Sequence, residues 1–222
     1  MSENTSGISR IRPTYFEIFT KVLNELNWRE VSDFDEIIKS EHRRILNLIN
    51  LTNSEVLSSY IWDFQIEKSE VTLEKEETTI LEDFGGKIIS VWEGTKKYKY
   101  IHPTQFNNSK QGFCDCYSSI GDLIVTVPSN LERKLSVIYV SDLYAQDSNG
   151  NKKLKMEEKD DTSILPIPYL EPILVYGTLI KVKANPSFAK FGYWRTLYYN
   201  ALCNLRTSGS KSFEDAPRIT FG

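Results

Sequence analysis

The chain has 222 residues, of which 40% are hydrophobic and 26% are charged, and its formal net charge is −3. This balance is typical of a globular protein and argues against binding of nucleic acid through overall positive charge. No apolar run is long enough to span a bilayer, and the polar first residues do not resemble a secretory signal, so we expect no membrane partner. The three cysteines, Cys114, Cys116 and Cys203, are an odd number, and we expect all of them to be reduced thiols of a protein made in the cytoplasm.

The N-terminal part of the chain is expected to form an arm followed by helices. The polar residues 1–12 predict a flexible arm. Apolar residues at helical spacing then predict a first helix from Pro13 and a second helix capped by Ser32 or Asp33. A weak capping signal at Thr52 predicts a further short turn of helix that closes this region.

Between residues 63 and 142 the pattern changes from helical spacing to alternation of apolar and polar residues, which is typical of strands. Five or six strands are expected. Gly94-Thr95 predicts a hairpin turn, and glycine and proline positions separate the later strands. We therefore expect an inserted antiparallel β domain, a meander or a sandwich.

Residues 143–163 are strongly charged, and Asn149-Gly150 within them marks a turn. We expect a solvated loop or a protruding hairpin, either ordered or disordered. A basic patch at Lys152, Lys153 and Lys155 is the functional alternative, but the acidic run that follows the lysines weakens it.

Two helices are predicted in residues 164–206, separated by Asn185-Pro186, which can stop one helix and cap the next. We expect Pro168 or Pro172 in the first turn of the first helix. Aromatic residues cover more than one face of the second helix, which suits burial against its own chain and against a partner. The alternative is a plain core hairpin of two helices, because aromatic stripes at helical spacing are usually core.

Together these elements predict an α+β fold. Helices from residues 13–62 and 164–206 would form a bundle, residues 63–142 the inserted β domain, and residues 143–163 a charged loop. Residues 207–222 form a polar tail with single apolar residues, which either stays disordered or becomes ordered on a neighbour.

We find no signature of catalysis or metal binding in the sequence. His42 and His102 have no ligand or nucleophile at a recognisable spacing, so surface histidines are expected. Gly85-Gly86-Lys87 is too short for a phosphate-binding loop, and the acidic runs are typical of solvated surface. The sequence therefore predicts a protein that is not an enzyme and has no catalytic residue, metal site or cofactor.

The order of elements resembles a known family. Two N-terminal helices lead into the aromatic junction LSSYIWDF, and an all-β segment follows that contains FGGKIISVWEG, DLIVTVP and KLSVIYV. A proline-containing run, LPIPYLEPILVYGTLIKV, then leads to a last helix that ends in YYNALCNLR. Over residues 14–206 the chain is similar to the head-to-tail connector (adaptor) proteins of tailed bacteriophages, particularly the tail tubular protein A type of short-tailed phages.

This resemblance implies a structural protein in the neck of the virion, assembled in the host cytoplasm. Copies of the chain would form a ring, expected to be a dodecamer, between the portal protein and the tail nozzle protein. DNA would pass through the ring without sequence-specific contacts during ejection, and a net negative surface would suit its passage because bound phosphates would retard it.

Two groups of residues are candidate contacts in such a ring. A terminal arm that threads onto the portal is implied by the resemblance, and its candidate residues are Phe213, Arg218, Ile219 and Phe221. The last helix has more aromatic surface than one hairpin partner can cover, which suits a repeated subunit interface. The candidates for this interface are Phe188, Phe191, Trp194 and Tyr198.

A binding module outside a virion is the competing hypothesis. Its β domain would present Trp92, Tyr98, Tyr100 and Tyr117 to the bases of a nucleic acid or to a carbohydrate. Alternating aromatic residues on strands are more often core residues or cross-strand pairs. The oligomeric state separates the two hypotheses, because a connector forms large rings or joins a portal, whereas a binding module is a monomer or a dimer.

Overall fold

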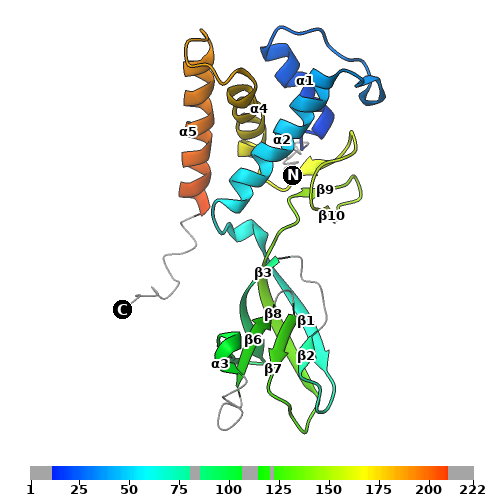
Figure 1. Ribbon diagram of the computed structural model, residues 1–222, viewed down its shortest axis with the longest axis vertical. Helices are drawn as coiled ribbons and strands as arrows, with labels where there is room; N and C mark the ends of the chain where they lie inside the picture. Colours follow the sequence, from blue (N-terminus) through cyan, green and yellow to red (C-terminus); the bar gives the residue numbers. More distant parts are fainter. Residues whose placement is uncertain (1–11, 81–85, 107–114, 121–122, 210–222) are drawn as a thin grey trace, which may run out of the picture. The chain divides into compact units, whose positions relative to one another are not determined.

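A computed structural model describes residues 12–80, 86–106, 115–120 and 123–209 of the chain and shows a mixed α+β fold (Figure 1). The chain divides into two compact units. Residues 1–60 and 144–222 belong to the first, which we call the helical unit, and residues 61–143 to the second, the β unit.

The helical unit contains four long helices and one short 3-10 helix. Its elements are α1 (Tyr15–Glu25), η1 (Phe34–Glu36), α2 (Ser40–Ser58), α4 (Ile167–Lys183) and α5 (Phe191–Gly209). Helix α4 packs against each of the other three long helices, and its buried residues lie on several sides. It is therefore the central helix, as expected for a helix that is hydrophobic all round.

Helix α4 approaches α2 and α5 closely at Gly177. A Cβ atom added there would lie 2.6 Å from Cγ2 of Thr52 on α2 and 2.8 Å from Cε2 of Tyr198 on α5. Only a residue without a side chain permits this approach. The first turn of α4 holds Pro168, whereas Pro172 lies inside the helix.

The predicted start of the second helix was wrong. Asp33 caps only the 3-10 helix η1, and α2 begins at Ser40 and runs without a break past Thr52 to Ser58. The hydroxyl of Thr52 donates to the carbonyl of Leu48 within the helix, so this residue continues α2 instead of capping a new one.

Helix α5 also begins later than the sequence suggests. The side chain of Asn185 accepts a hydrogen bond from the N–H of Ser187 at 3.0 Å, which forms a local turn. Ala184, with a φ of 24°, ends α4 just before this turn. The next helix therefore starts only at Phe191.

The charged segment after the β unit was expected to be a solvated loop or a protruding hairpin; β9 and β10 do form an antiparallel hairpin, but the segment as a whole is not solvated. It forms a small sheet with the order β10-β9-β11, from β9 (Ala145–Gln146), β10 (Lys152–Lys153) and β11 (Thr162–Ser163). The turn at Asn149-Gly150 is confirmed, since Gly150 with a φ of 85° lies in the connection from β9 to β10. Several residues of this segment are buried in the helical unit: Ala145, Met156, Asp161, Thr162 and Ser163.

The β unit contains two four-stranded sheets. The first has the order β1-β8-β3-β4, and its strands are β1 (Ile66–Leu73), β8 (Arg133–Ser141), β3 (Gly86–Glu93) and β4 (Lys96–Lys97). The second has the order β2-β7-β6-β5, and its strands are β2 (Thr79–Ile80), β7 (Leu123–Thr126), β6 (Cys116–Ile120) and β5 (Lys99–Tyr100). Two short helices, η2 (Asp63–Gln65) and α3 (Pro103–Phe106), complete the unit.

This strand order is not that of a simple meander, in which consecutive strands would pair. The last strand, β8, lies between β1 and β3, and β5 pairs in parallel with β6. The predicted hairpin at Gly94 is confirmed, because Trp92 of β3 pairs with Lys97 of β4.

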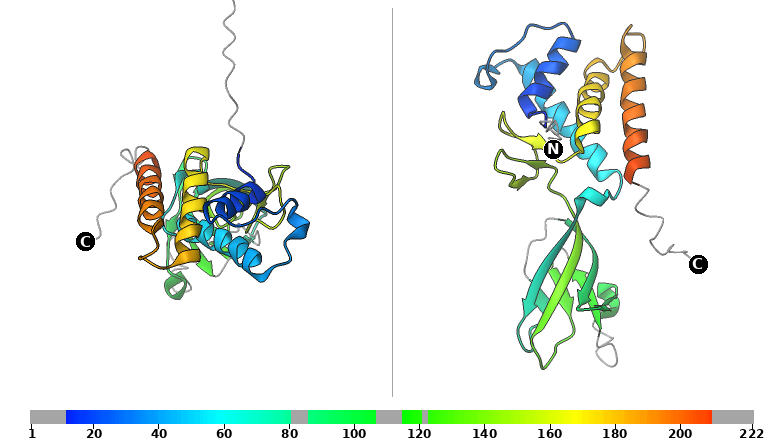
Figure 2. Two further views of the ribbon diagram at one scale, coloured as in Figure 1. Left: turned by 90° about the horizontal axis from the view of Figure 1, so that it is seen from above. Right: turned by 180° about the vertical axis from the view of Figure 1, so that it is seen from behind.

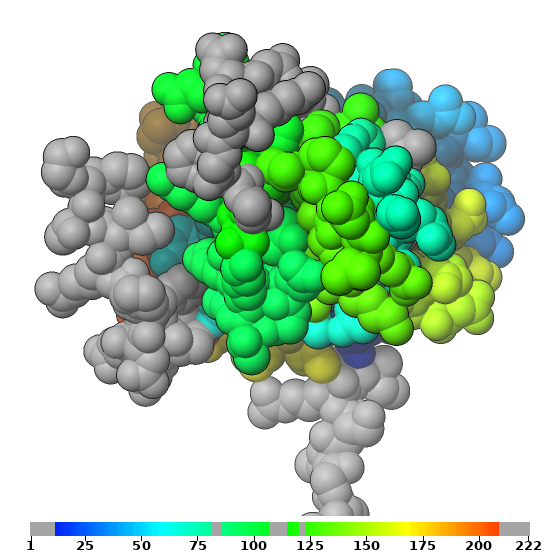
Figure 3. Space-filling view, turned by 90° about the horizontal axis from the view of Figure 1, so that it is seen from below, coloured from blue at the N-terminus to red at the C-terminus, as the bar shows by residue number. Residues whose placement is uncertain are grey.

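Residues of both sheets of the β unit share one hydrophobic core. Figure 3 shows this unit in cyan and green from one end. The core residues are Val71, Leu73, Ile80, Val91, Tyr98, Tyr117, Ile124, Leu135 and Val137.

Candidate interaction surface

Helix α5 lies at one edge of the helical unit, against α4, with its far side open (Figures 1 and 2). Trp194, Ala201 and Leu205 are buried on its inner side. Residues spaced three or four apart share a side of a helix, so the residues on the far side form one continuous strip. We call this strip, with its exposed neighbour Tyr193, the outer α5 face; its residues are Tyr193, Arg195, Tyr199, Cys203 and Arg206.

Two tyrosines dominate the outer α5 face. Tyr193 is 59% exposed and Tyr199 is 50% exposed, although both are large aromatic residues. The ring of Tyr193 packs edge-on against Tyr176 of α4 at 6.4 Å, and the guanidinium of Arg195 lies 5.7 Å from the ring of Tyr199. Tyrosine and arginine are enriched at the centres of protein interfaces, so this composition favours a contact with a partner.

The outer α5 face carries positive charge only. Helix α5 contains Arg195 and Arg206 and no acidic residue. Within the described part of the chain neither arginine forms an ion pair. Lys190, just before the helix, is different, since its ammonium lies 3.7 Å from the carboxylate of Glu25 on α1. The two arginines of the face are therefore available to an acidic partner.

The four residues predicted from the sequence for a ring interface lie in different environments: Phe188, 37% exposed, precedes α5, and Phe191, Trp194 and Tyr198 lie on it. Trp194 is fully buried, and its indole N–H donates to the carboxylate of Glu25 at 3.1 Å. Phe191 and Tyr198 are half-buried, and Phe188 stacks on Trp194 at 5.4 Å between ring centroids. Tyr193, Arg195 and Tyr199 were missed, because aromatic residues on several sides of a helix do not reveal which side its own chain covers. The arm residues Phe213, Arg218, Ile219 and Phe221 lie outside the described residues.

The segment Glu30–Ile38, which includes η1, lies across the helical unit from α5 (Figure 2). We call it the acidic segment, because it contains four carboxylates and no basic residue: Glu30, Asp33, Asp35 and Glu36. Ile38 at its end is 75% exposed. The segment is anchored by Phe34, whose ring packs edge-on against Phe16 of α1 at 6.1 Å, and by the buried Ile37. A groove of about 450 Å³ runs between Phe34, Ile37 and the side of α2.

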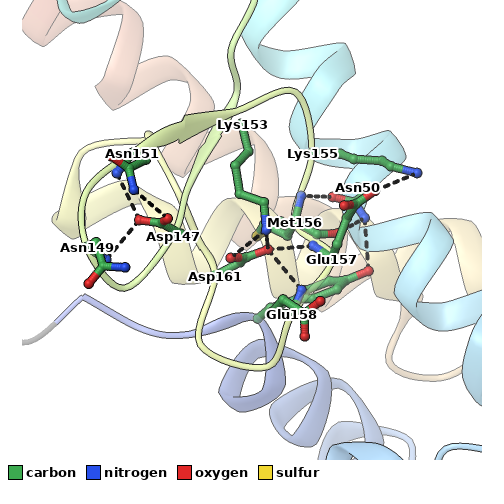
Figure 4. A network of polar contacts seen from close by, with 11 residues as sticks. Asn50, Asp147, Asn149, Asn151, Lys153, Lys155, Met156, Glu157, Glu158 and Asp161 are labelled. Atoms are coloured by element: carbon green, nitrogen blue, oxygen red, sulfur yellow. Dashed lines mark hydrogen bonds and ion pairs between the residues drawn. The ribbon is translucent and has the colours of Figure 1, made fainter.

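The small sheet beside the acidic segment is held in place by Asp161 (Figure 4). Its carboxylate, only 2% exposed, accepts hydrogen bonds from the backbone N–H groups of Glu157 and Glu158 at 2.6 and 2.9 Å and pairs with the ammonium of Lys153 at 2.8 Å. Its backbone carbonyl accepts the N–H of Tyr15 at 2.7 Å, so it also satisfies a donor at the start of α1. The charged residues 143–163 are therefore part of the scaffold, and Lys153 is not part of an open basic patch.

The environment of Asp161 shifts its pKa. Burial alone would raise the pKa, but the ion pair with Lys153 and the two backbone donors outweigh burial, and the pKa of Asp161 lies below its ordinary value. The same pair raises the pKa of Lys153. Both groups are therefore charged at neutral pH.

Two asparagines of α2 join the helix to the small sheet. Asn50 exchanges two hydrogen bonds with the backbone of Met156, at 2.8 and 3.1 Å (Figure 4). Asn53 is buried, donates to the carbonyl of Tyr144 at 2.9 Å and accepts from the hydroxyl of Ser163 at 2.7 Å. The sheet thus presents a fixed surface next to α2.

The four aromatic residues proposed for ligand stacking in the β unit do not share one surface. Tyr98 and Tyr117 are buried in the core, whereas Tyr100 is 48% exposed. The indole N–H of Trp92 donates to the hydroxyl of Ser90 at 2.9 Å, and Lys97 lies over its ring. Tyr98 is therefore closed to a base or a sugar, whereas Tyr100 and Tyr117 pack edge-on at 5.5 Å between ring centroids and both line a cavity of about 460 Å³.

The titratable residues of the described chain show no arrangement for metal binding: no group of three or more His, Cys, Asp or Glu side chains is placed to hold an ion. His102 is exposed, as expected, but His42 is buried and packs edge-on against Phe19, which corrects the expectation of a surface residue. Cys116 is buried and Cys203 is exposed, and Cys114 lies outside the described residues.

Comparison with models of known protein families finds no match, and no curated protein matches the sequence. Among the helices of the described residues, none has the length and apolar character needed to cross a membrane. The inference of function therefore depends on the surfaces described above and on the resemblance of the sequence.

Proposed function

We propose that the protein is a structural component of a tailed-bacteriophage virion and forms a ring that joins the portal to the tail. The observation that carries this proposal is the outer α5 face, where Tyr193, Arg195 and Tyr199 are exposed on a regular helix. The resemblance of residues 14–206 to head-to-tail connector proteins supplies the biological setting.

The physical support for this proposal is that the outer α5 face exposes large aromatic side chains to water. A tyrosine on a helix has few rotatable bonds, so it offers a large contact area at a low cost in conformational entropy. Arg195 over the ring of Tyr199 adds a charged group that can bind carboxylates in a partner. In a ring every subunit uses this face once, against a complementary face of its neighbour.

In the proposed architecture the helices of residues 13–62 and 164–206 form the bundle that contacts ring neighbours. The β domain of residues 63–142 is inserted into it and contacts the tail nozzle protein, and the terminal arms extend from it. The arm that binds the portal would use Phe213, Arg218, Ile219 and Phe221. DNA passes through the ring without sequence-specific contacts.

The test is the mass of the full-length protein by native mass spectrometry, alone and with its candidate portal protein. We expect a ring-sized species or a stoichiometric complex with the portal. The variant Tyr199→Ser should weaken assembly, whereas Tyr100→Ser, at a similarly exposed tyrosine of the β unit, should not. A persistent monomer that ignores the portal would overturn the proposal.

The arm has a test of its own. Helix α5 extends to Gly209, so the predicted arm at residues 207–222 begins with helical residues, and the deletion should start at residue 210. Removal of residues 210–222 should leave the circular dichroism spectrum of the helices unchanged and abolish binding to the portal. Normal binding by the shortened chain would show that the arm is not the contact.

A further inference from the structure

We infer that copies of this chain associate head to tail, with the outer α5 face of one copy docked on the acidic segment of the next. This inference rests on the proposed ring and names the two surfaces that would meet in it. The occupant of the outer α5 face is therefore a second copy of the same chain, which contributes a different face.

Charge argues against contact between two outer α5 faces. In such a symmetric pair each face would meet its own copy, and Arg195 and Arg206 would oppose the same arginines of the neighbour. Like charges brought together at an interface are strongly unfavourable, and α5 has no acidic residue to compensate for them. The face therefore requires a partner surface that is different from itself and carries carboxylates.

The acidic segment provides such a surface. Its carboxylates at Asp33, Asp35 and Glu36 are exposed. Arg29 and Lys39, which flank the segment, are exposed as well, but they are two cations against four carboxylates, so the region remains net acidic. In the described part of the chain these three carboxylates form no ion pair. A guanidinium group is well suited to bind carboxylates in pairs of hydrogen bonds, so the two faces match in charge and in chemistry.

The apolar parts of the two faces also match. Ile38 is more exposed than any other large hydrophobic residue of the described chain, and it stands beside the acidic groups. A tyrosine ring such as that of Tyr199 can cover it, while the phenol oxygen remains at the polar rim. Phe34 and the buried Ile37 hold the segment against α1, so docking would not need to order a loose chain.

The positions of the two faces agree with a closed ring. In all three ribbon views of Figures 1 and 2, α5 and the acidic segment lie on opposite sides of the helical unit. Two different faces on opposite sides make a heterologous contact, which adds one subunit after another and gives a ring where the rotation closes and an open filament where it does not. The same separation prevents Cys203 on α5 from reaching the acidic segment of its own copy.

Cys203 permits a direct test, because it is a native exposed thiol on the outer α5 face. In a Cys114→Ser background of the full chain, Ile38→Cys is introduced and the protein is treated with a short bismaleimide. We expect a ladder of covalent dimers, trimers and higher multiples on a denaturing gel. The control is Leu131→Cys, which places a thiol at a site of equal exposure (74%) in the β unit and should give no ladder.

Each other outcome overturns the pairing in a recognisable way. Dimers alone, formed by Cys203 without any introduced cysteine, would show a symmetric α5 contact. Rings by native mass spectrometry without an Ile38→Cys ladder would refute the assigned faces and leave the proposed function intact. A chain that stays monomeric, ignores the portal and gives no ladder would refute both.

Charge exchange gives a second, independent test. Arg195→Glu with Arg206→Glu should raise the protein concentration needed for half-maximal assembly by about tenfold or more, and Asp33→Arg with Asp35→Arg in the same chain should restore it. Failure of this rescue would contradict the pairing. Loss of DNA binding in the arginine variant, with assembly unchanged, would assign the outer α5 face to the phosphate backbone instead.

Discussion

The ammonium of Lys153 lies 2.8 Å from the carboxylate of Asp161, within a segment whose charges suggest a solvated loop. The pair is unequal, since the side chain of Asp161 is almost wholly buried and that of Lys153 is about a quarter exposed (27%). Because the carboxylate also binds two backbone N–H groups, it holds the return of the chain from β10 to β11 in one conformation.

Replacement of Asp161 by asparagine should therefore destabilise the helical unit. The variant loses the ion pair and leaves Lys153 without its partner, and we expect a loss of about 2 kcal/mol in the free energy of unfolding. Urea denaturation measures this loss. Asp160→Asn, at the exposed neighbouring carboxylate, is the matched control and should change stability by less than about 0.5 kcal/mol.

The lowered pKa of Asp161 predicts how stability depends on pH. The pKa of the unfolded side chain is higher than that of the folded one, so the unfolded chain binds this proton at a higher pH. The contribution of Asp161 is therefore complete above the unfolded pKa and is lost as the pH falls through the folded pKa. As the pH is lowered below about 5, the urea midpoint of the native chain should fall more steeply than that of Asp161→Asn. The same dependence of the urea midpoint on pH in both proteins would contradict the prediction.

Gly177 should not tolerate alanine, although alanine is the better helix former. The added methyl group would lie within 3 Å of side-chain atoms of both Thr52 and Tyr198, so these side chains, or the helices that carry them, would have to shift. We expect a destabilisation of about 1–3 kcal/mol from this overpacking, measured by thermal unfolding. The control is Gly192→Ala, because no atom lies within 4 Å of a Cβ at Gly192 and the substitution should be neutral or stabilising.

Arg133 should contribute to the stability of the β unit. It is buried on β8, and its guanidinium donates to the hydroxyl of Thr126 on β7 at 3.1 Å and to the carbonyl of Glu77 at 3.2 Å, which links the two sheets. Arg133→Ala would remove this link, and we expect a loss of about 2 kcal/mol because both acceptors lose a charged donor. Lys134→Ala changes the exposed next residue and should have little effect on the denaturation midpoint.

The sequence by itself determined the local features whose cause lies within a few residues. Alternation after residue 62 predicted strands, since that period places every second residue on one face. Gly94 predicted the hairpin from β3 to β4, because its φ of 58° is one that glycine adopts without strain. These signals were sufficient for an α+β fold class.

Tertiary structure decided the features that depend on partners far away in the chain. From the sequence, Thr52 was interpreted as a helix cap, but it lies inside α2 and packs near Gly177. The charged run that contains Asp161 was interpreted as surface, but Asp161 contacts Lys153 and the start of α1. The interaction surface follows the same rule: α4 covers the side of α5 that carries Trp194 and leaves Tyr199 in water. Which side of a helix is buried depends on the neighbour against which it packs, and residues distant in sequence supply that neighbour.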